Sequence, residues 1–183
     1  MEGRLGIISD THGNLRAWQA ALKIWGRVDL ILHAGDVLYH GPNNPLPEEY
    51  GPRELAEAMN ASSVPLLFAQ GNCDAEEDAR MLRWPLDART VTVWWRGMLV
   101  LMRHGENFSA FRDLALRCGA RLAVSGHTHV GSVVREEGTI FLNPGSASLP
   151  KGRDPASCAI ADGEGISILT LEGTLLHREP WNL

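Results

Sequence analysis

The stretch Leu5-Gly6-Ile7-Ile8-Ser9-Asp10-Thr11-His12 decides how this chain of 183 residues is interpreted, because an apolar run ends there in an aspartate and a histidine. A short apolar run of this kind predicts a buried β-strand. Four further runs end in similar residues: Leu30–Ala34 before Gly35-Asp36, Leu66–Ala69 before Gly71-Asn72, Leu99–Met102 before His104-Gly105, and Leu122–Val124 before Gly126-His127-Thr128-His129. We therefore expect these polar side chains to meet at one edge of a sheet.

The first half of the chain alternates predicted strands with predicted helices. A helix with Asn14 as its N-cap is expected from Leu15 to Trp25, and a second helix from Pro52 to Asn60. A short third helix is expected near Ala75–Arg83, with Asp74 and Glu77 as a capping box. Alternation of strands and helices is typical of parallel sheets with crossover helices.

The second half shifts toward β-structure. Thr90–Trp95 and Met98–Met102 predict a hairpin around Arg96-Gly97, and one more helix ends at Gly119. Five later strands are expected at Ser132–Arg135, Thr139–Leu142, Cys158–Ala161, Gly165–Leu171 and Leu175–Arg178. Together the halves predict an α/β fold of two packed mixed sheets with helices outside, in a single domain spanning residues 1–183.

Composition narrows the classes of function. The chain has 17 Lys and Arg against 22 Asp and Glu, a formal net charge of −5, which disfavours stable nucleic-acid binding. Its 3 cysteines lack paired spacing, which argues against a disulfide framework and favours a reducing compartment. Because Met1-Glu2-Gly3-Arg4 shows no leader and no apolar run is long enough to span a membrane, we expect a cytoplasmic protein without membrane contact.

The polar residues that follow the strands form a candidate metal-ligand set: Asp10, His12, Asp36, Asn72, His104, His127 and His129. Nitrogen and oxygen donors without a thiolate suit Mn²⁺, Fe, Co²⁺, Ni²⁺ or Zn²⁺ better than Mg²⁺ or Ca²⁺. The set is large enough to hold two divalent ions, and a hydroxide bound between them could attack a phosphate ester. The predicted function is therefore metal-dependent hydrolysis of small phosphate diesters, with phosphate monoesters or small nucleotides as alternatives.

These motifs also resemble a known family. Asp10-Thr11-His12, Gly35-Asp36, Gly71-Asn72-Cys73-Asp74, His104-Gly105 and Gly126-His127-Thr128-His129 resemble, in order, the motifs of the calcineurin-like metallophosphoesterase superfamily. Gly35-Asp36-Val37-Leu38-Tyr39-His40-Gly41-Pro42 and Asn143-Pro144-Gly145-Ser146, with Pro150-Lys151-Gly152, resemble its small bacterial YfcE-type phosphodiesterases. The resemblance implies a four-layer αββα sandwich and Mn²⁺ as the cofactor.

The resemblance further implies a division of the ligands. Asp10, His12, Asp36 and His129 would hold the first ion, and Asp36, Asn72, His104 and His127 the second, so that Asp36 bridges the two. Asn72 would also contact a phosphate oxygen of the substrate. Where many members have a histidine that acts as general acid, this chain has Cys73. Because a thiol protonates a leaving alkoxide less readily than an imidazolium does, we expect a preference for good leaving groups, such as aryl groups.

Several assignments stay open. The leaving group would be protonated by solvent or weakly by Cys73, because His104 should not be both a tight ligand and a free acid. His40, in the long loop after Asp36, is either a substrate contact or a structural residue, and Glu106 stands where relatives often have a second histidine. Trp94 and Trp95 predict at least one outward-facing tryptophan, which sheet packing or a homo-oligomer contact would explain.

One alternative comes from a different class of function. Some relatives with this fold have lost metal ligands and act as non-catalytic scaffolds for other proteins. Here all seven ligand positions are filled, which favours an enzyme.

Overall fold

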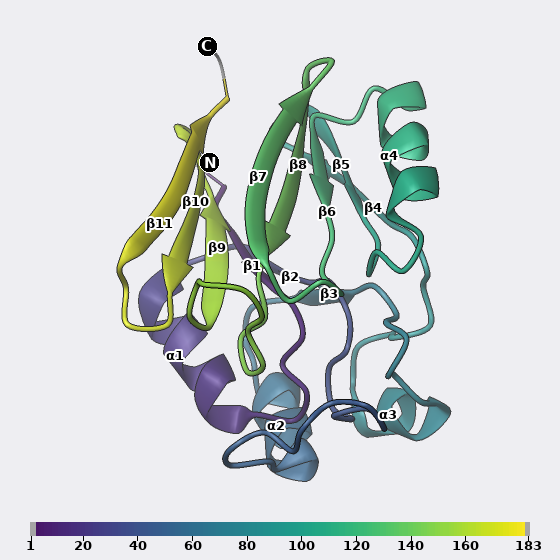
Figure 1. Ribbon diagram of the computed structural model, residues 1–183, viewed down its shortest axis with the longest axis vertical. Helices are drawn as coiled ribbons and strands as arrows, with labels where there is room; N and C mark the ends of the chain where they lie inside the picture. Colours follow the sequence, from purple (N-terminus) through teal and green to yellow (C-terminus); the bar gives the residue numbers. More distant parts are fainter. Residues whose placement is uncertain (1–2, 182–183) are drawn as a thin grey trace.

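The computed structural model describes residues 3–181, and these residues form two β-sheets (Figure 1). The six-stranded sheet has the order β11 (Leu175–Pro180), β10 (Gly165–Thr170), β9 (Ser157–Ala161), β1 (Leu5–Ile8), β2 (Leu30–His33) and β3 (Leu66–Phe68). The five-stranded sheet has the order β4 (Val91–Trp95), β5 (Met98–Met102), β6 (Leu122–Val124), β8 (Thr139–Pro144) and β7 (Gly131–Glu136). Both sheets mix parallel and antiparallel pairs, as predicted.

The described residues contain four α-helices, close to the predicted positions: α1 (Leu15–Trp25), α2 (Pro52–Asn60), α3 (Glu76–Met81) and α4 (Phe108–Arg117). Asn14 caps α1 as expected, because its side chain accepts a hydrogen bond from the backbone N–H of Ala17. None of the helices within residues 3–181 combines the length and apolar character needed to cross a bilayer. The domain predicted over residues 1–183 includes the ends of the chain, and the expectation about a leader concerns Met1-Glu2; both lie partly or wholly outside the described residues.

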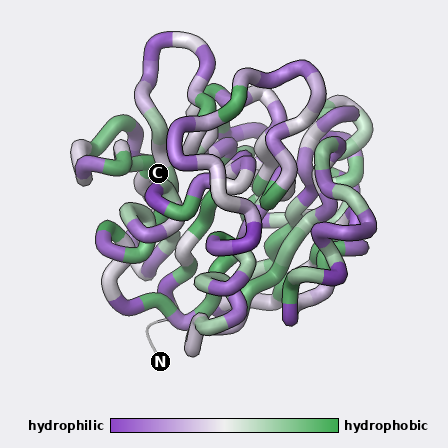
Figure 2. Tube along the Cα trace, turned by 90° about the horizontal axis from the view of Figure 1, so that it is seen from below, coloured by the Kyte–Doolittle hydropathy of each residue, from purple (hydrophilic) through white to green (hydrophobic). Residues whose placement is uncertain are grey.

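Alternate residues of each strand build the layers. In β1, Ile7 lies in the core between the two sheets, whereas Ile8 lies in the core shared with α1 and α2, beside Trp18. In the five-stranded sheet, Val100 faces the other sheet, whereas Leu101 lies in a third core with α4. Figure 2, seen from below, shows hydrophilic stretches along the outer loops and hydrophobic stretches within the elements between them. The predicted four-layer αββα sandwich is confirmed.

The prediction that five strands deliver their polar residues to one edge of a single sheet was wrong. β1, β2 and β3 belong to the six-stranded sheet, whereas β5 and β6 belong to the five-stranded sheet. The loops after these strands meet because the two sheets pack face to face with the carboxyl ends of these strands at the same end of the sandwich, the lower end in Figure 1. The site therefore lies across two sheets.

The predicted capping box of Asp74 and Glu77 was also wrong. The N-cap of α3 is Ala75, and the side chain of Asp78 accepts a hydrogen bond from the Ala75 N–H at 3.0 Å. Asp74 instead accepts hydrogen bonds from three backbone N–H groups of the site loops, in Asp36 (2.9 Å), Val37 (2.7 Å) and Gly71 (2.7 Å). Because its carboxylate binds these backbone donors, which a local sequence pattern does not reveal, Asp74 does not cap α3.

Candidate metal centre

The backbone of the ligand loops is unusual. The predicted ligands follow β1, β2, β3, β5 and β6, and five of them have a left-handed backbone: Asp10 (φ 53°), His12 (φ 43°), Asp36 (φ 57°), His127 (φ 68°) and His129 (φ 61°). Residues with a side chain rarely adopt this conformation, which costs about 1–3 kcal/mol each and persists where the surroundings impose it. Such strain gathers at functional sites, so these loops are shaped to place particular side chains.

Two glycines permit the loops to approach each other closely. A Cβ atom on Gly71 would lie 2.2 Å from Oδ1 of Asp36, and one on Gly126 would lie 1.9 Å from Oγ of Ser9. Both distances are far below van der Waals contact, so a larger residue would displace a site loop. The close approach of the loops therefore explains why glycine precedes Asn72 and His127.

Asp10, His12, Asp36 and His129 form a compact, buried group whose ligand atoms all lie within 4.8 Å of one another. Oδ1 of Asp10 is 3.2 Å from Nε2 of His129 and 3.9 Å from Nε2 of His12. Oδ2 of Asp36 is 3.8 Å from the same nitrogen of His12. Donor atoms at these separations fit around one cation with metal–ligand distances of about 2.0–2.2 Å.

A second group adjoins the first through Asp36. Nε2 of His104 lies 3.4 Å from Oδ2 of Asp36 and 3.1 Å from Oδ1 of Asn72. The same amide oxygen lies 2.8 Å from Nδ1 of His127. Asn72 is exposed and His127 is half-buried, so this group faces solvent on one side. The structure thus brings together all seven predicted ligands, with Asp36 between the two groups.

Backbone carbonyls orient three of the imidazoles. Because a carbonyl oxygen only accepts hydrogen bonds, the bonded Nδ1 carries a proton, and Nε2 faces the carboxylates. The bonds run from His12 to Tyr39 (2.9 Å), from His104 to Ala34 (2.8 Å) and from His129 to Leu149 (2.6 Å). This arrangement is typical of metal-binding histidines, whose second nitrogen is fixed by a hydrogen bond.

The electrostatics of the cluster also fit a bound cation. Burial by itself would lower the pKa of His104, but its hydrogen bond to Asp36 and the charge of Asp10 outweigh burial and raise this pKa to about 9. Burial opposes ionisation of Asp36, yet the neighbouring histidines hold its pKa well below the usual range. Oδ1 of Asp10 is fully buried, and no hydrogen bond of acceptable geometry reaches it within residues 3–181. A buried carboxylate oxygen surrounded by imidazole nitrogens needs a counter-ion, which a divalent cation supplies.

Some residues that hold the loops were underestimated from the sequence. The carbonyl of Asp10 accepts hydrogen bonds from the hydroxyls of Ser146 (2.8 Å) and Ser148 (3.0 Å). Asn143 donates to the carbonyl of Gly126 at 2.7 Å and so holds the loop that carries His127. Ser146 and Asn143 were visible in the Asn-Pro-Gly-Ser motif, but only the fold shows which loops they hold.

Cys73 and His40 lie beside the cluster in different settings. Burial and the charge of Asp36 raise the pKa of the Cys73 thiol to about 12. Its sulfur accepts a hydrogen bond from the side-chain amide of Asn72 at 3.3 Å. His40 lies between the rings of Tyr39 and Tyr50, with centroid distances of 4.8 and 5.2 Å, and its buried Nδ1 has no hydrogen-bond partner among the described residues.

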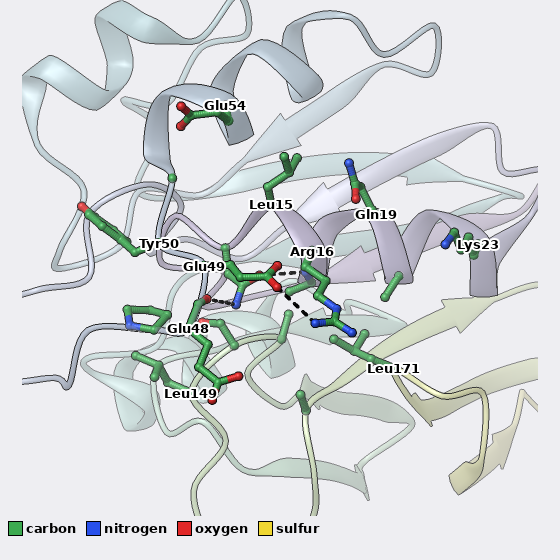
Figure 3. Close-up of a pocket in the computed structure, with 18 of the residues that line it drawn as sticks. Leu15, Arg16, Gln19, Lys23, Glu48, Glu49, Tyr50, Glu54, Leu149 and Leu171 are labelled. Carbon is green, nitrogen blue, oxygen red and sulfur yellow. Dashed lines mark hydrogen bonds and ion pairs between the residues drawn. The ribbon is translucent and has the colours of Figure 1, made fainter.

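A wide groove of about 1500 Å³ runs along α1 (Figure 3), but it is separate from the ligand cluster. None of the seven predicted ligands lines it. Arg16 in this groove is paired with Glu49 at 3.1 Å, and further carboxylates lie nearby on Glu48 and Glu54. An acidic lining disfavours an anionic ligand in this groove.

Residues 4–165 match the calcineurin-like phosphoesterase superfamily domain. With the two-sheet sandwich and the cluster of metal-ligand side chains, this match defines the class: the chain belongs to that superfamily and is a hydrolase that acts on phosphate-ester bonds. The predicted family and enzyme class are confirmed.

The chain is 37% identical over 171 residues to phosphodiesterase YfcE of Escherichia coli strain K12, with 92% of each chain covered. A solved structure of YfcE, a phosphoesterase from E. coli, superposes with a TM-score of 0.85 and 30% sequence identity, covering 98% of this chain and 100% of that one. A protein of Methanothermobacter thermautotrophicus described as "Probable metallophosphoesterase" is 31% identical over 186 residues, covering 96% of this chain and 90% of that one. These relatives match along nearly the whole length of the chain.

Proposed function

We propose that this protein is a phosphodiesterase that uses two divalent metal ions per chain. Asp10, His12, Asp36 and His129 would hold the first ion, and Asp36, Asn72, His104 and His127 the second. The observation that carries the proposal is the position of Asp36, whose Oδ2 lies 3.8 Å from Nε2 of His12 and 3.4 Å from Nε2 of His104. A carboxylate between two sets of imidazoles can bridge two ions.

The donor set also limits the identity of the metal. Imidazole, carboxylate and amide donors suit Mn²⁺, Fe, Co²⁺, Ni²⁺ and Zn²⁺, and we propose Mn²⁺ as the resident ion from the family resemblance. When bound, two such ions would lower the pKa of a shared water and stabilise the attacking and leaving oxygens of the phosphate. The carboxylates of Asp10 and Asp36 offset only half of the four positive charges, so the site would attract an anion.

The side chains at the open side of the cluster favour a diester over a monoester. Asn72 is exposed and offers its amide to a phosphate oxygen. The carboxylate of Glu106 lies close enough to His127 to raise the pKa of that histidine, against the stronger lowering by burial and by His104. A phosphate monoester carries about two negative charges at neutral pH, whereas a diester carries one. The negative charge of Glu106 therefore repels a monoester more strongly than a diester.

The leaving group would depart with little help from an acid of the protein. General acids work best when their pKa is near the operating pH, and the Cys73 thiol, with its pKa raised to about 12, is far from it. His104 is expected to be a metal ligand. Protonation by solvent therefore suits good leaving groups, such as aryl groups, better than alkyl groups.

The test is metal-dependent hydrolysis of a bis-aryl phosphate by protein first treated with a chelator. We expect no turnover without metal and recovery with Mn²⁺. His129→Gln should abolish activity and reduce bound metal, whereas His177→Gln is the matched control because His177 is exposed on β11, outside the cluster. Absence of turnover with each of Mn²⁺, Co²⁺, Ni²⁺, Fe²⁺ and Zn²⁺ would favour the non-catalytic scaffold, and full activity of His129→Gln would contradict the assigned site.

The substrate class needs a separate comparison. Aryl diesters and aryl monoesters with the same leaving group should differ in kcat/KM in favour of the diester. A higher kcat/KM for monoesters, or for small nucleotides, would support the alternative activities on the same site. We also propose a cytoplasmic protein that acts on small phosphate esters, a location that the three free cysteines favour.

A further inference from the structure

The two sheets end in four edge strands, and an unprotected edge strand readily pairs with another chain. On one side of the sandwich, the edges β11 and β7 are protected. β11 carries charged residues and has an irregular register with β10, and Nε of Arg135 in β7 donates to Glu179 in β11 at 2.8 Å. Charges, irregular pairing and bridges between sheets are the devices that blunt an edge.

On the other side of the sandwich, the edge strands β3 and β4 differ in how well they are protected from pairing with another chain. β3 has only three residues, and the segment that follows α3 lies alongside it, because the Gln70 N–H donates to the carbonyl of Ala88 at 2.9 Å. β4, with the sequence Val91-Thr92-Val93-Trp94-Trp95, has five residues and no charge. Of the four edges in residues 3–181, β4 is the one without a protecting device.

The hairpin fixes which backbone groups of β4 are free. Arg96 and Gly97 both have positive φ (50° and 76°), as in a two-residue type I′ turn. In such a hairpin the residues beside the turn exchange hydrogen bonds, and every second pair repeats the pattern. Val93 therefore bonds to β5, whereas the N–H and C=O groups of Thr92 and Trp94 point outward, and no backbone hydrogen bond from elsewhere in residues 3–181 reaches them.

The side chains along this edge are also exposed. Trp94 is 73% exposed, whereas its neighbour Trp95 is 8% exposed and packs between the sheets. Thr92 is exposed on the same outer face as Trp94. Trp94 is paired across the hairpin with Leu99, which is itself only partly buried. An exposed tryptophan on an open, uncharged edge marks an interaction surface.

We propose that β4 pairs in antiparallel register with β4 of a second copy of this chain, so that the two five-stranded sheets become one ten-stranded sheet. With Val93 on the twofold axis, Thr92 of each copy faces Trp94 of the other. The outward N–H and C=O groups of both residues then find partners in both directions. In this register each outer-face pair sets the aromatic Trp94 opposite the β-branched Thr92, and no like charges meet, so a second copy of β4 is a favourable occupant.

Two further features agree with this pairing. It spans Val91–Trp95 and stops before Arg96, whose guanidinium lies 5.7 Å from the centre of the Trp95 ring, on the inner face. A twofold axis perpendicular to the sheet places the two copies of α4 on the same face and the two ligand clusters at opposite ends. The dimer therefore leaves both metal centres open to solvent.

The test is the mass of the purified full-length protein by light scattering during gel filtration, with the wild type compared with two edge variants. Trp94→Lys adds a charge to the edge. Thr92→Pro removes an outward N–H that pairing with β5 does not use. The control is Val134→Lys, a change of an exposed residue (57%) on β7, the opposite edge. Phosphoesterase activity of each variant reports that it is folded.

We expect the wild type and Val134→Lys to have at least twice the mass of one chain, and both edge variants to have half the mass of the wild type with activity retained. Should Thr92→Pro fail to fold, Trp94→Lys decides alone. A monomeric wild type at 0.1 mM protein would overturn the proposal, and so would an assembly whose mass is unchanged in the active edge variants.

Discussion

The two groups of the metal centre differ in how firmly the fold holds them. In the first group, Asp10 and His12 are completely buried, and the carbonyl of Asp10 is held by two serine hydroxyls. In the second group, Asn72 is exposed and His127 is half-buried. Interactions buried in a rigid setting define positions more sharply than those at the surface. Under the proposed function, the first group would fix where the ions lie, and the second group would meet the substrate.

Asp36 belongs to both groups, so its replacement should have the largest effect. Asp36→Asn keeps the size of the side chain and the acceptor for the Cys73 N–H, which Oδ1 of Asp36 binds at 2.8 Å. It removes the negative charge that both sets of imidazoles share. We expect a loss of about 10³-fold in kcat, because metal ions supply several kcal/mol of charge stabilisation, and bound Mn²⁺ well below two ions per chain by elemental analysis.

The control for Asp36→Asn is Asp113→Asn, a change of an exposed carboxylate on α4. Retention of two ions per chain and of most activity in Asp36→Asn would show that the two groups act as separate sites without a shared ligand.

Replacement of one residue in each group separates their roles. His12→Ala should lose the ion of the buried group and lower the melting temperature measured in the presence of Mn²⁺, because a ligand that binds only the folded state stabilises it. Asn72→Ala should keep one ion per chain and lose about 10²-fold in kcat, the usual cost of one group that contacts the transition state. Metal content, melting temperature and kcat measured on the same samples check this order. An equal fall in melting temperature in both variants would remove the distinction between a fixed and an open group.

Two pairs of the cluster could be predicted from the sequence because their residues are encoded locally. Asp10 and His12 are two residues apart at the end of a strand, as are His127 and His129 beyond another strand, and their chemistry is visible without coordinates. The strands and helices were likewise predicted with small shifts of their ends. The fold class followed from the change between alternating strands and helices in the first half and hairpins in the second.

What the sequence did not reveal depends on contacts between distant loops. Asp74 was interpreted as a helix cap because the preference of aspartate for that position is local, but Asp36 and Val37 of a distant loop, together with Gly71, supply competing backbone donors. The buried His33 lies with its Nε2 2.9 Å from Oγ1 of Thr11, a partner 22 residues away in the sequence. Assignment of the ligands to two sheets needed the packing of those sheets, which no local pattern encodes.

Cys73 gives the finest comparison, because it lies between the two groups: its N–H binds Asp36 and its sulfur accepts from the amide of Asn72. With its pKa raised to about 12, the thiol stays protonated through neutral pH and is a weak proton donor. We therefore expect Cys73→Ala to change kcat by no more than about 5-fold with an aryl leaving group, with a similar factor for alkyl leaving groups. The effect would arise from looser positioning of Asn72, since the lost hydrogen bond is worth about 1 kcal/mol.

A series of diesters with leaving groups of increasing pKa distinguishes positioning from acid catalysis. If Cys73→Ala lowers kcat by one constant factor across the series, the thiol acts through Asn72, and Cys73→Ser, which keeps a hydrogen-bond acceptor, should recover part of the loss. If the loss instead grows steadily with the pKa of the leaving group, Cys73 delivers the proton. The open group would then contain both the substrate contact and the general acid, and the distinction between the two groups would be sharper than the structure alone indicates.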